Sequence, residues 1–221
     1  MLEAAKAVFE ETGFLEARIT DIADRAGLSH GSFYHYFDSK EQVFREVAEA
    51  QETLLTAPAV DDRDDADAAP PPSEVDRIRR ANRLYFERYR DNGRIMGVIE
   101  EVSRYDAHVN DARMRRQKHF ADRAEHAIRR LQAEGAADPD VDPHIAAVAL
   151  GSMVGRFAEL WLVEGWEKFD FDDVVEQVTR LWANAIGLRE PATKARKAKA
   201  TNAAKTTKAA KFSRTTKRRT G

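Results

Sequence analysis

The residues best able to do chemistry lie close together in the stretch ITDIADRAGLSHGSFYHYFDSKE, at positions 19–41. His30 and His35 offer two imidazoles, and Tyr34 adds a phenol. Histidines five positions apart do not share one helix face, and no cysteine or carboxylate completes a ligand set, so the pattern predicts no metal site. Tyr34 and His35 lack a nucleophile–base–orienter arrangement, so we expect no catalytic residues here.

The spacing of this stretch instead predicts two short helices joined by a tight turn. The second helix of the chain is expected to open at Thr20 as its N-cap. Gly27 permits the turn, and Ser29 caps a third helix over His30 to Tyr36. Helix, glycine turn, helix is the pattern of a helix-turn-helix, whose second helix enters the major groove of DNA.

On this third helix the polar and apolar residues fall on different sides. Phe33 and Phe37 are four apart and are predicted to share the buried face. His35 can donate to or accept from base edges, and Tyr34 can donate to a phosphate. The alternative is that all the aromatic rings, Tyr36 included, form a small core.

The same segment resembles the N-terminal DNA-binding domain of TetR-type transcriptional regulators. The resemblance covers about residues 2–50 and rests on VFEETGF, on the T-x-x-D-I-A-x-x-A-G-x-S run, on GSFYHYF and on SKE. It implies that phosphate or DNA-backbone contacts are made by Thr20, Ser29, Ser32, Tyr34 and Lys40. It implies that the positions where bases are read are His30, Gly31, Ser32 and His35.

Charge is distributed unevenly along the 221 residues. Residues 1–56 hold five basic and eleven acidic residues, a net charge of −6, which is awkward for a DNA-binding segment because phosphate neutralisation dominates non-specific affinity. Residues 189–221 hold twelve basic residues and one acidic residue, a net charge of +11. This tail is predicted to be disordered, and either has no specific role or acts as a sequence-independent DNA clamp.

The composition bounds the class of protein. The chain has no cysteine, which excludes disulfides, thiolate metal sites and cysteine nucleophiles. No run approaches 18 consecutive apolar residues, so we expect no membrane span or membrane partner. The N-terminus carries acids where a secretory signal carries bases, so a cytoplasmic protein is expected.

Helical periodicity without two-residue alternation predicts an all-α fold: a helix-turn-helix domain followed by a helical bundle. The expected segments are a DNA-binding domain at 1–56, an acidic, proline-rich linker or loop at 57–73, an effector-binding and dimerisation domain at 74–188, and the tail at 189–221. The helices expected in the third segment cover 73–92, 94–105, 107–134, 143–164 and 172–186.

Two of these helices are more apolar than one chain needs. The helix at 143–164 is apolar nearly all round, and the last helix carries two apolar stripes, so we expect a homodimer joined through a four-helix bundle. The residues assigned to that interface are Val154, Leu160, Val175, Val178, Trp182 and Ile186. A two-fold dimer would let two recognition helices reach half-sites about 34–36 Å apart.

Large adaptable side chains on the body helices could surround a cavity or simply form core. The candidates are Tyr85, Tyr89, Met96, Ile99, Met114, Phe120, Phe157 and Trp161. TetR-type proteins generally hold an effector in this body, and an apolar lining would suit a small lipophilic compound. Arg156 is expected to pair with Glu159, or otherwise with an acidic group of the effector.

Taken together, these patterns favour a ligand-responsive, homodimeric regulator that binds double-stranded DNA at a palindromic operator, more as a repressor than an activator, with no cofactor. The alternative is a nucleoid-type DNA-binding protein that relies on the basic tail. An enzyme using Glu100 and Glu101 is a third hypothesis, which no residue spacing supports.

Overall fold

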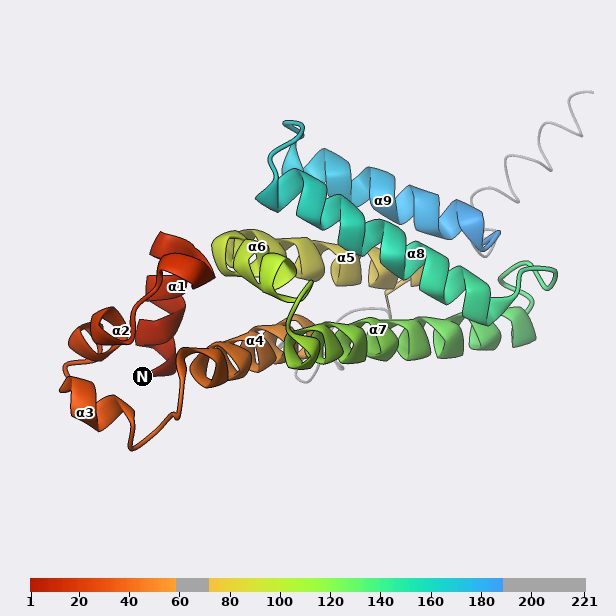
Figure 1. Ribbon diagram of the computed structural model, residues 1–221. Helices are drawn as coiled ribbons and strands as arrows, with labels where there is room; N and C mark the ends of the chain where they lie inside the picture. Colours follow the sequence, from red (N-terminus) through yellow and green to blue (C-terminus); the bar gives the residue numbers. More distant parts are fainter. Residues whose placement is uncertain (59–71, 189–221) are drawn as a thin grey trace, which may run out of the picture.

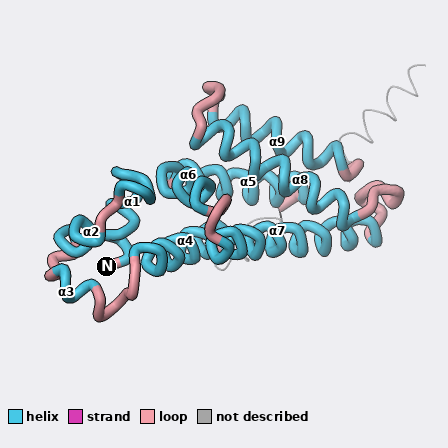
Figure 2. The backbone as a smooth tube through the Cα atoms, in the orientation of Figure 1, coloured by secondary structure: helices cyan, strands magenta, loops and turns pink. Residues whose placement is uncertain are grey.

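The computed structural model describes residues 1–58 and 72–188, and this part of the chain contains helices and no strand (Figure 2). The predicted all-α fold is therefore confirmed there, while most of the predicted linker and the whole basic tail lie outside the described residues. The helices are α1 Leu2–Glu16, α2 Ile19–Arg25, α3 His30–Phe33, α4 Lys40–Thr56, α5 Glu74–Asp91, α6 Gly93–Val102, α7 Ala107–Ala133, α8 Pro143–Ala158, a π-helical segment η2 Glu159–Val163, and α9 Phe171–Ala185.

The long helices of the body begin where the sequence offers a capping side chain. Ser73, Asp106, Asp142 and Asp170 each accept hydrogen bonds from backbone N–H groups in the first turn of the helix that follows. Such caps satisfy donors that have no partner within the helix. The helices that follow Ser73, Asp106 and Asp170 begin and end within a few residues of the expected bounds.

The helix predicted over 143–164 does not run through as one regular α-helix. After Ala158 it widens into η2, where the N–H of Glu164 donates to the carbonyl of Glu159 over 3.0 Å. Two glycines of α6 leave room for this segment. A Cβ at Gly93 would lie 3.2 Å from the carbonyl oxygen of Leu162, and one at Gly97 would lie 2.9 Å from Val163 Cγ1.

The molecule is elongated, with α2 and α3 at one end and α8 and α9 forming an outer layer of the body (Figure 1). Helix α4 runs from the α1–α3 end into the body and packs along α7, and α1 packs against α6. Buried side chains form a continuous apolar core from Ala5 on α1 to Val178 on α9. The N-terminal helices and the body therefore share one core across α4 and α6.

By length and composition alone, the segment Pro143–Val163 is apolar enough to cross a membrane. In the structure it packs against α7 and α5, which is the position of a helix inside a folded body. Only 22% of the most apolar 18-residue stretch of this segment is buried within the chain. One side of this apolar helix therefore lacks a cover in a single copy.

Candidate functional site

Helices α2 and α3 are joined by the tight turn that the sequence predicts. Gly27 has a φ of 68°, a left-handed conformation that other residues rarely adopt, and the N–H of Leu28 donates to the carbonyl of Ala23 over 2.9 Å. Ser29 then caps α3, because its Oγ accepts from the N–H of Ser32 over 3.1 Å. The helix, glycine turn and capped second helix are confirmed in this order.

Helix α3 is shorter than predicted and ends at Phe33, but its winding continues as turns. The N–H groups of Tyr36 and Phe37 both donate to the carbonyl of Phe33, over 2.9 and 3.1 Å. Phe33 is fully buried and Phe37 is 7% exposed. These two rings anchor the segment to the core as predicted.

The opposite side of this segment is open to solvent. His30, Gly31 and His35 are exposed, as is the side chain of Tyr34, at 49%. The rings of His30 and Tyr34 lie against each other with centroids 5.3 Å apart. The prediction that all the rings form a core is therefore wrong for Tyr34, and also for Tyr36, which is 63% exposed.

The start of α2 differs from the sequence prediction. Arg18, not Thr20, occupies the N-cap position, and it makes no side-chain cap hydrogen bond. Thr20 lies inside the first turn, exposed, with Oγ1 3.4 Å from the Asp21 carboxylate. Arg18 is exposed and forms no ion pair within residues 1–58 and 72–188. Sequence reasoning missed it, although it is a basic residue at the start of a helix next to the turn.

Lys40 is engaged inside the protein. Its ammonium donates to the carbonyl oxygens of Phe14, Leu15 and Ala17 over 2.8, 3.0 and 3.0 Å, and it lies 4.8 Å from the centre of the Phe14 ring. Three carbonyl acceptors match the three donors of an ammonium group. The structure thus assigns Lys40 to holding the end of α1, and we remove it from the expected phosphate contacts.

Acidic residues of the N-terminal helices form ion pairs with some of the few basic residues of the same helices. Arg25 donates to both carboxylate oxygens of Glu11 over 2.7 Å, and this bond lowers the pKa of Glu11. Lys6 lies 3.2 Å from Glu10. The cations left on the α2–α3 end are thus fewer than the sequence count suggests.

The side chains expected to line an effector cavity mostly form packed core. Tyr89, Met96 and Ile99 are at most 1% exposed, whereas Met114 is 48% exposed. Ring contacts link Tyr85 to Phe120 at 5.5 Å and Phe157 to Trp161 at 5.9 Å. Of the two possibilities, cavity lining or core, most of these side chains pack as core, whereas Met114 lies at the surface.

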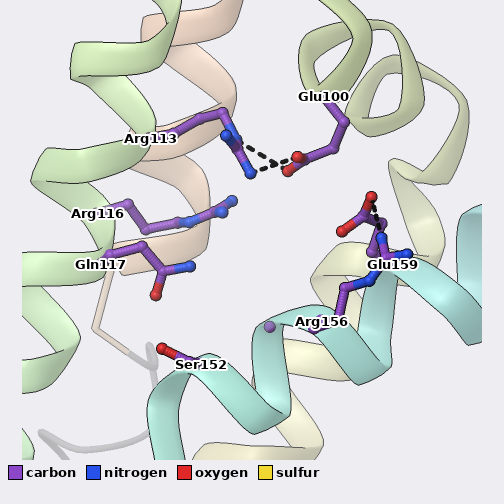
Figure 3. Close-up of a pocket in the computed structure, with 8 residues that line it drawn as sticks. Glu100, Arg113, Arg116, Gln117, Ser152, Arg156 and Glu159 are labelled. Atoms are coloured by element: carbon purple, nitrogen blue, oxygen red, sulfur yellow. Dashed lines mark hydrogen bonds and ion pairs between the residues drawn. The ribbon is translucent and has the colours of Figure 1, made fainter. Parts of the chain in front are cut away.

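A cavity of about 170 Å³ lies elsewhere, between α6, α7, α8 and the start of η2. We call it the arginine pocket, and it is lined by Glu100, Arg113, Arg116, Gln117, Ser152, Gly155, Arg156 and Glu159 (Figure 3). None of the eight predicted lining residues is among them. The sequence analysis named Arg156 and Glu159 as an expected ion pair, with an acidic effector group as the alternative partner of Arg156, and it named Glu100 only in the enzyme hypothesis.

Two arginines of the pocket are already paired. Arg113 Nε donates to Glu100 Oε1 over 3.0 Å, and Arg156 lies 2.5 Å from Glu159, which confirms the predicted pair (Figure 3). Burial raises the pKa of Glu100, and Arg113 works against that rise. The pocket therefore contains both signs of charge, fixed by helices α6, α7 and α8.

The third arginine, Arg116, is buried with its counter-charge on α4. Its Nη1 lies 2.9 Å from Glu52 Oε2, and the two side chains are 3% and 4% exposed. The charges are adjacent, but neither carboxylate oxygen of Glu52 nor Nε or Nη1 of Arg116 is in hydrogen-bonding geometry. Burial raises the pKa of Glu52 despite the neighbouring arginines. Two charged groups are therefore buried with incomplete hydrogen bonding.

Most of the predicted dimer residues belong to the core of a single chain. Val154, Val175, Val178 and Ile186 are at most 8% exposed and pack within the chain, so they cannot form an interface, while Leu160 and Trp182 are half-buried. The apolar residues left exposed on α8 and α9 are different ones: Ile145, Val148 and Leu181. On these two helices the exposed apolar side chains therefore differ from the predicted ones, because the helical period alone does not say which face meets the rest of the chain.

Within residues 1–58 and 72–188, no group of three or more His, Asp or Glu residues is placed to hold a metal ion. His126 instead lies 2.6 Å from the carbonyl of Asp122, and His144 lies 2.8 Å from Glu125.

Two descriptions of protein families match the chain. Residues 1–47 match "Bacterial regulatory proteins, tetR family", and residues 78–187 match "Transcriptional regulator EthR, C-terminal domain". The first match contains the whole of α1, α2 and α3, and the second contains the arginine pocket.

Curated relatives match over the N-terminal segment. The transcriptional repressor KstR2 of Rhodococcus jostii is 45% identical over 47 residues, 21% of this chain and 23% of that protein. KstR2 of Mycobacterium tuberculosis is 47% identical over 47 residues, 21% of this chain and 24% of that protein. The match spans about a quarter of the length of these relatives.

Solved structures match over most of the chain. A TetR/AcrR-family regulator from Thermobifida fusca is 26% identical, with a TM-score of 0.60 over 86% of this chain and 96% of that one. The regulator FadR from Bacillus subtilis, solved in complex with stearoyl-CoA, has a TM-score of 0.65 at 16% identity over 84% of this chain and 97% of that one. The chain therefore has the helical fold of these regulators, and with family descriptions matching residues 1–47 and 78–187 it belongs to the TetR family of bacterial regulatory proteins.

Proposed function

We propose that this chain is a transcriptional repressor that binds double-stranded DNA through α3 and is released by a small ligand held in its helical body. The observation that carries the proposal is the two-sided segment after Gly27. Phe33 and Phe37 fix it to the core, while His30, Tyr34 and His35 face solvent. An anchored helix with free polar side chains can enter a major groove without rearranging the fold.

The assignment of DNA contacts follows exposure. His30, Gly31 and His35 are proposed to read bases, and Tyr34 and Thr20 to contact phosphates. Ser29 and Ser32 have their hydroxyl oxygens 2.8 Å apart. Each hydroxyl retains capacity for a further hydrogen bond to the DNA backbone. Arg18 joins this set as an exposed base at the start of α2.

A two-fold dimer would place two such segments on one palindromic operator. Support comes from the exposed apolar residues of α8 and α9, above all Ile145 at 67% and Leu181 at 54% exposure. Exposed apolar patches of this kind mark protein–protein contacts. We propose that the protein acts in the cytoplasm, with DNA and a second copy of itself as partners and without enzymatic activity.

The effector is proposed to be a small compound with a lipophilic part. FadR, whose fold this chain shares, was solved with stearoyl-CoA. Ligand binding in the body would shift the population of states that differ in the placement of α1–α3, because α4 and α6 connect the two regions.

The test is selection of bound duplexes from a random DNA library with the full chain, followed by affinity measurement on the selected sequence. We expect a palindrome with two half-sites about one helical turn or a multiple of it apart. In the variant Tyr34→Ala/His35→Ala, affinity for that palindrome should fall at least about thirtyfold, since two contacts are lost and each costs about 1–3 kcal/mol.

The matched control is Tyr105→Ala, because Tyr105 is 59% exposed on a different part of the surface. It should bind like the unmodified chain. Undiminished affinity of the Tyr34→Ala/His35→Ala variant would contradict the proposal, as would equal binding to all duplexes. The latter result would favour the nucleoid-type alternative, whose basic tail lies outside the described residues.

A further inference from the structure

The arginine pocket differs from the rest of the body interior, in which most buried side chains are apolar. Its guanidinium groups come from two helices, Arg113 and Arg116 from α7 and Arg156 from α8 (Figure 3). Gln117 and Ser152 add an amide and a hydroxyl that can donate. The cavity of about 170 Å³ is close to the volume of about 150 Å³ that holds a benzene ring in an engineered protein cavity.

Among the residues that line the pocket, the buried donors without a hydrogen bond belong to Arg116, whose Nη1 has only the charge of Glu52 beside it, at 2.9 Å. Nε and Nη1 of this side chain make no hydrogen bond, although the residue is buried, with only 4% of its surface exposed. Leaving buried donors of a charged group unpaired is costly, so such groups are found paired in most folded proteins. A ligand that supplies acceptor oxygens would complete the site, whereas a cationic ligand would leave these donors unpaired.

The paired arginines favour the same type of ligand. Arg156 is partly exposed and is bound to Glu159 and also to Glu164, at 3.2 Å, on the rim side of the pocket. Because a solvent-exposed ion pair contributes little free energy, the Arg156 side chain can leave its glutamates and bind a ligand in the cavity instead. Arginine forks bind carboxylate and phosphate oxygens in pairs, which gives both strength and orientation.

We propose that the arginine pocket binds the anionic end of the effector, a carboxylate or phosphate group, with Arg116 as its buried anchor and Arg156 at its rim. This proposal rests on the proposed function and narrows the effector to a compound that joins a lipophilic part to an oxyanion. An anion in the pocket competes for Arg116 with Glu52, which lies on α4 and is not part of the pocket lining.

The position of Glu52 connects the pocket to the DNA-binding end. Glu52 lies on α4, which leads directly from the α3 segment, and Arg116 lies on α7. Two further ion pairs join the same helix to α7 and its N-cap, Arg45 with Asp106 at 2.9 Å and Glu49 with Arg115. An anion that competes for Arg116 weakens its buried ion pair with Glu52, and this reduces the attraction between α4 and α7.

The experiment compares a carboxylate with its uncharged analogue on the full chain. Benzoate and benzamide have the same ring and nearly the same size, and inorganic phosphate tests the other oxyanion. By calorimetry and thermal shift, benzoate or phosphate is expected to bind at least about tenfold more tightly than benzamide, the difference typical of a hydrogen bond to a charged group. Binding by benzoate alone identifies a carboxylate effector, and binding by phosphate alone identifies a phosphorylated one.

Two variants test whether the ligand sits at Arg116. Glu52→Met/Arg116→Met removes both buried charges and keeps the volume filled, so it is expected to fold and to lose the anion preference. Arg115→Met is the matched control, since Arg115 is the neighbouring arginine on α7 with a side chain 60% exposed, and it should keep the preference. Equal binding of benzoate and benzamide, no binding of either anion, or an unchanged preference in the double variant overturns the proposal.

Operator binding is measured on the same samples so that the two proposals fail separately. An operator-specific chain that binds no anion refutes the pocket assignment and leaves the repressor function intact. A chain that binds benzoate through Arg116 but no specific DNA refutes the repressor function alone. At saturating anion, operator affinity is expected to fall, and unchanged affinity overturns the competition with Glu52.

Discussion

Replacing Arg116 by methionine isolates the energetic role of the buried pair between α4 and α7. Two opposite charges with centres about 4 Å apart attract by about 4 kcal/mol at an effective dielectric constant of about 20. Removing one partner leaves the other charge buried, and such changes cost about 3–5 kcal/mol. Since Glu52 is 4% exposed, Arg116→Met should lower the free energy of unfolding by about that amount near neutral pH.

The loss should depend on pH with a definite sign. Burial raises the pKa of Glu52 in the folded state, while the nearby charge of Arg116 lowers it, so removing Arg116 raises that pKa further. A carboxyl whose folded pKa lies above its unfolded value binds more protons when folded, so stability falls as pH rises between the two values. The Arg116→Met variant should therefore regain stability as the pH is lowered from 8 towards 5, by at most about 1.4 kcal/mol per pH unit.

The assay is urea unfolding followed by circular dichroism at several pH values and one fixed protein concentration, because association shifts apparent stability. Glu52→Met/Arg116→Met is the reference, and it should recover most of the lost stability with no added pH dependence. The reasoning would be refuted by an Arg116→Met variant as stable as the unmodified chain, or by one that gains nothing on acidification while the double variant is restored.

Three further changes test single features. Lys40→Met removes three hydrogen bonds from an ammonium group to carbonyl oxygens, and it should lower the free energy of unfolding in urea by about 1.5–3 kcal/mol. If stability is intact and the salt dependence of DNA binding is shallower, Lys40 instead contacts a phosphate. Gly27→Val forces a branched side chain into a φ of 68° and should lower the free energy of unfolding by at least about 1–2 kcal/mol. The control Gly151→Ala, with open space around the new Cβ, should not destabilise the chain in the same denaturation assay. Val148→Glu/Leu181→Glu places charges on the exposed apolar side of α8 and α9 and should convert dimers to folded monomers in sedimentation equilibrium; dimers that persist would locate the interface elsewhere.

The local chemistry of the N-terminal segment could be predicted because it depends on neighbours in sequence. Gly27 is required by a turn with positive φ, Ser29 by a helix start, and the spacing of Phe33 and Phe37 by a shared face. These features involve residues at most four apart, so a sequence pattern contains all the information needed. The start of α2 was also a local matter: Thr20 has no capping role because α2 begins two residues earlier than predicted, with Arg18 at the N-cap.

Contacts between segments distant in sequence determined which apolar side chains are buried and which are exposed. Val175 and Val178 were expected to face a second copy, but α5 covers α9 and buries them within the chain. The residues left uncovered are Val148 and Leu181, which no periodicity distinguishes from their neighbours. A helical repeat establishes that a helix has several apolar faces, and only the packing partners decide which face is internal.

The sequence by itself determined that the chain is helical, that a glycine turn precedes a capped recognition helix, and that its phenylalanines are the anchors, because each follows from covalent spacing and backbone geometry. Tertiary structure alone decided that Lys40 closes the end of α1, that most of the expected pocket residues pack as core, and that Arg116 on α7 meets Glu52 on α4. Those two charged residues are 64 positions apart in the sequence, and charge pairing across that distance arises only when the folded core brings the two helices together.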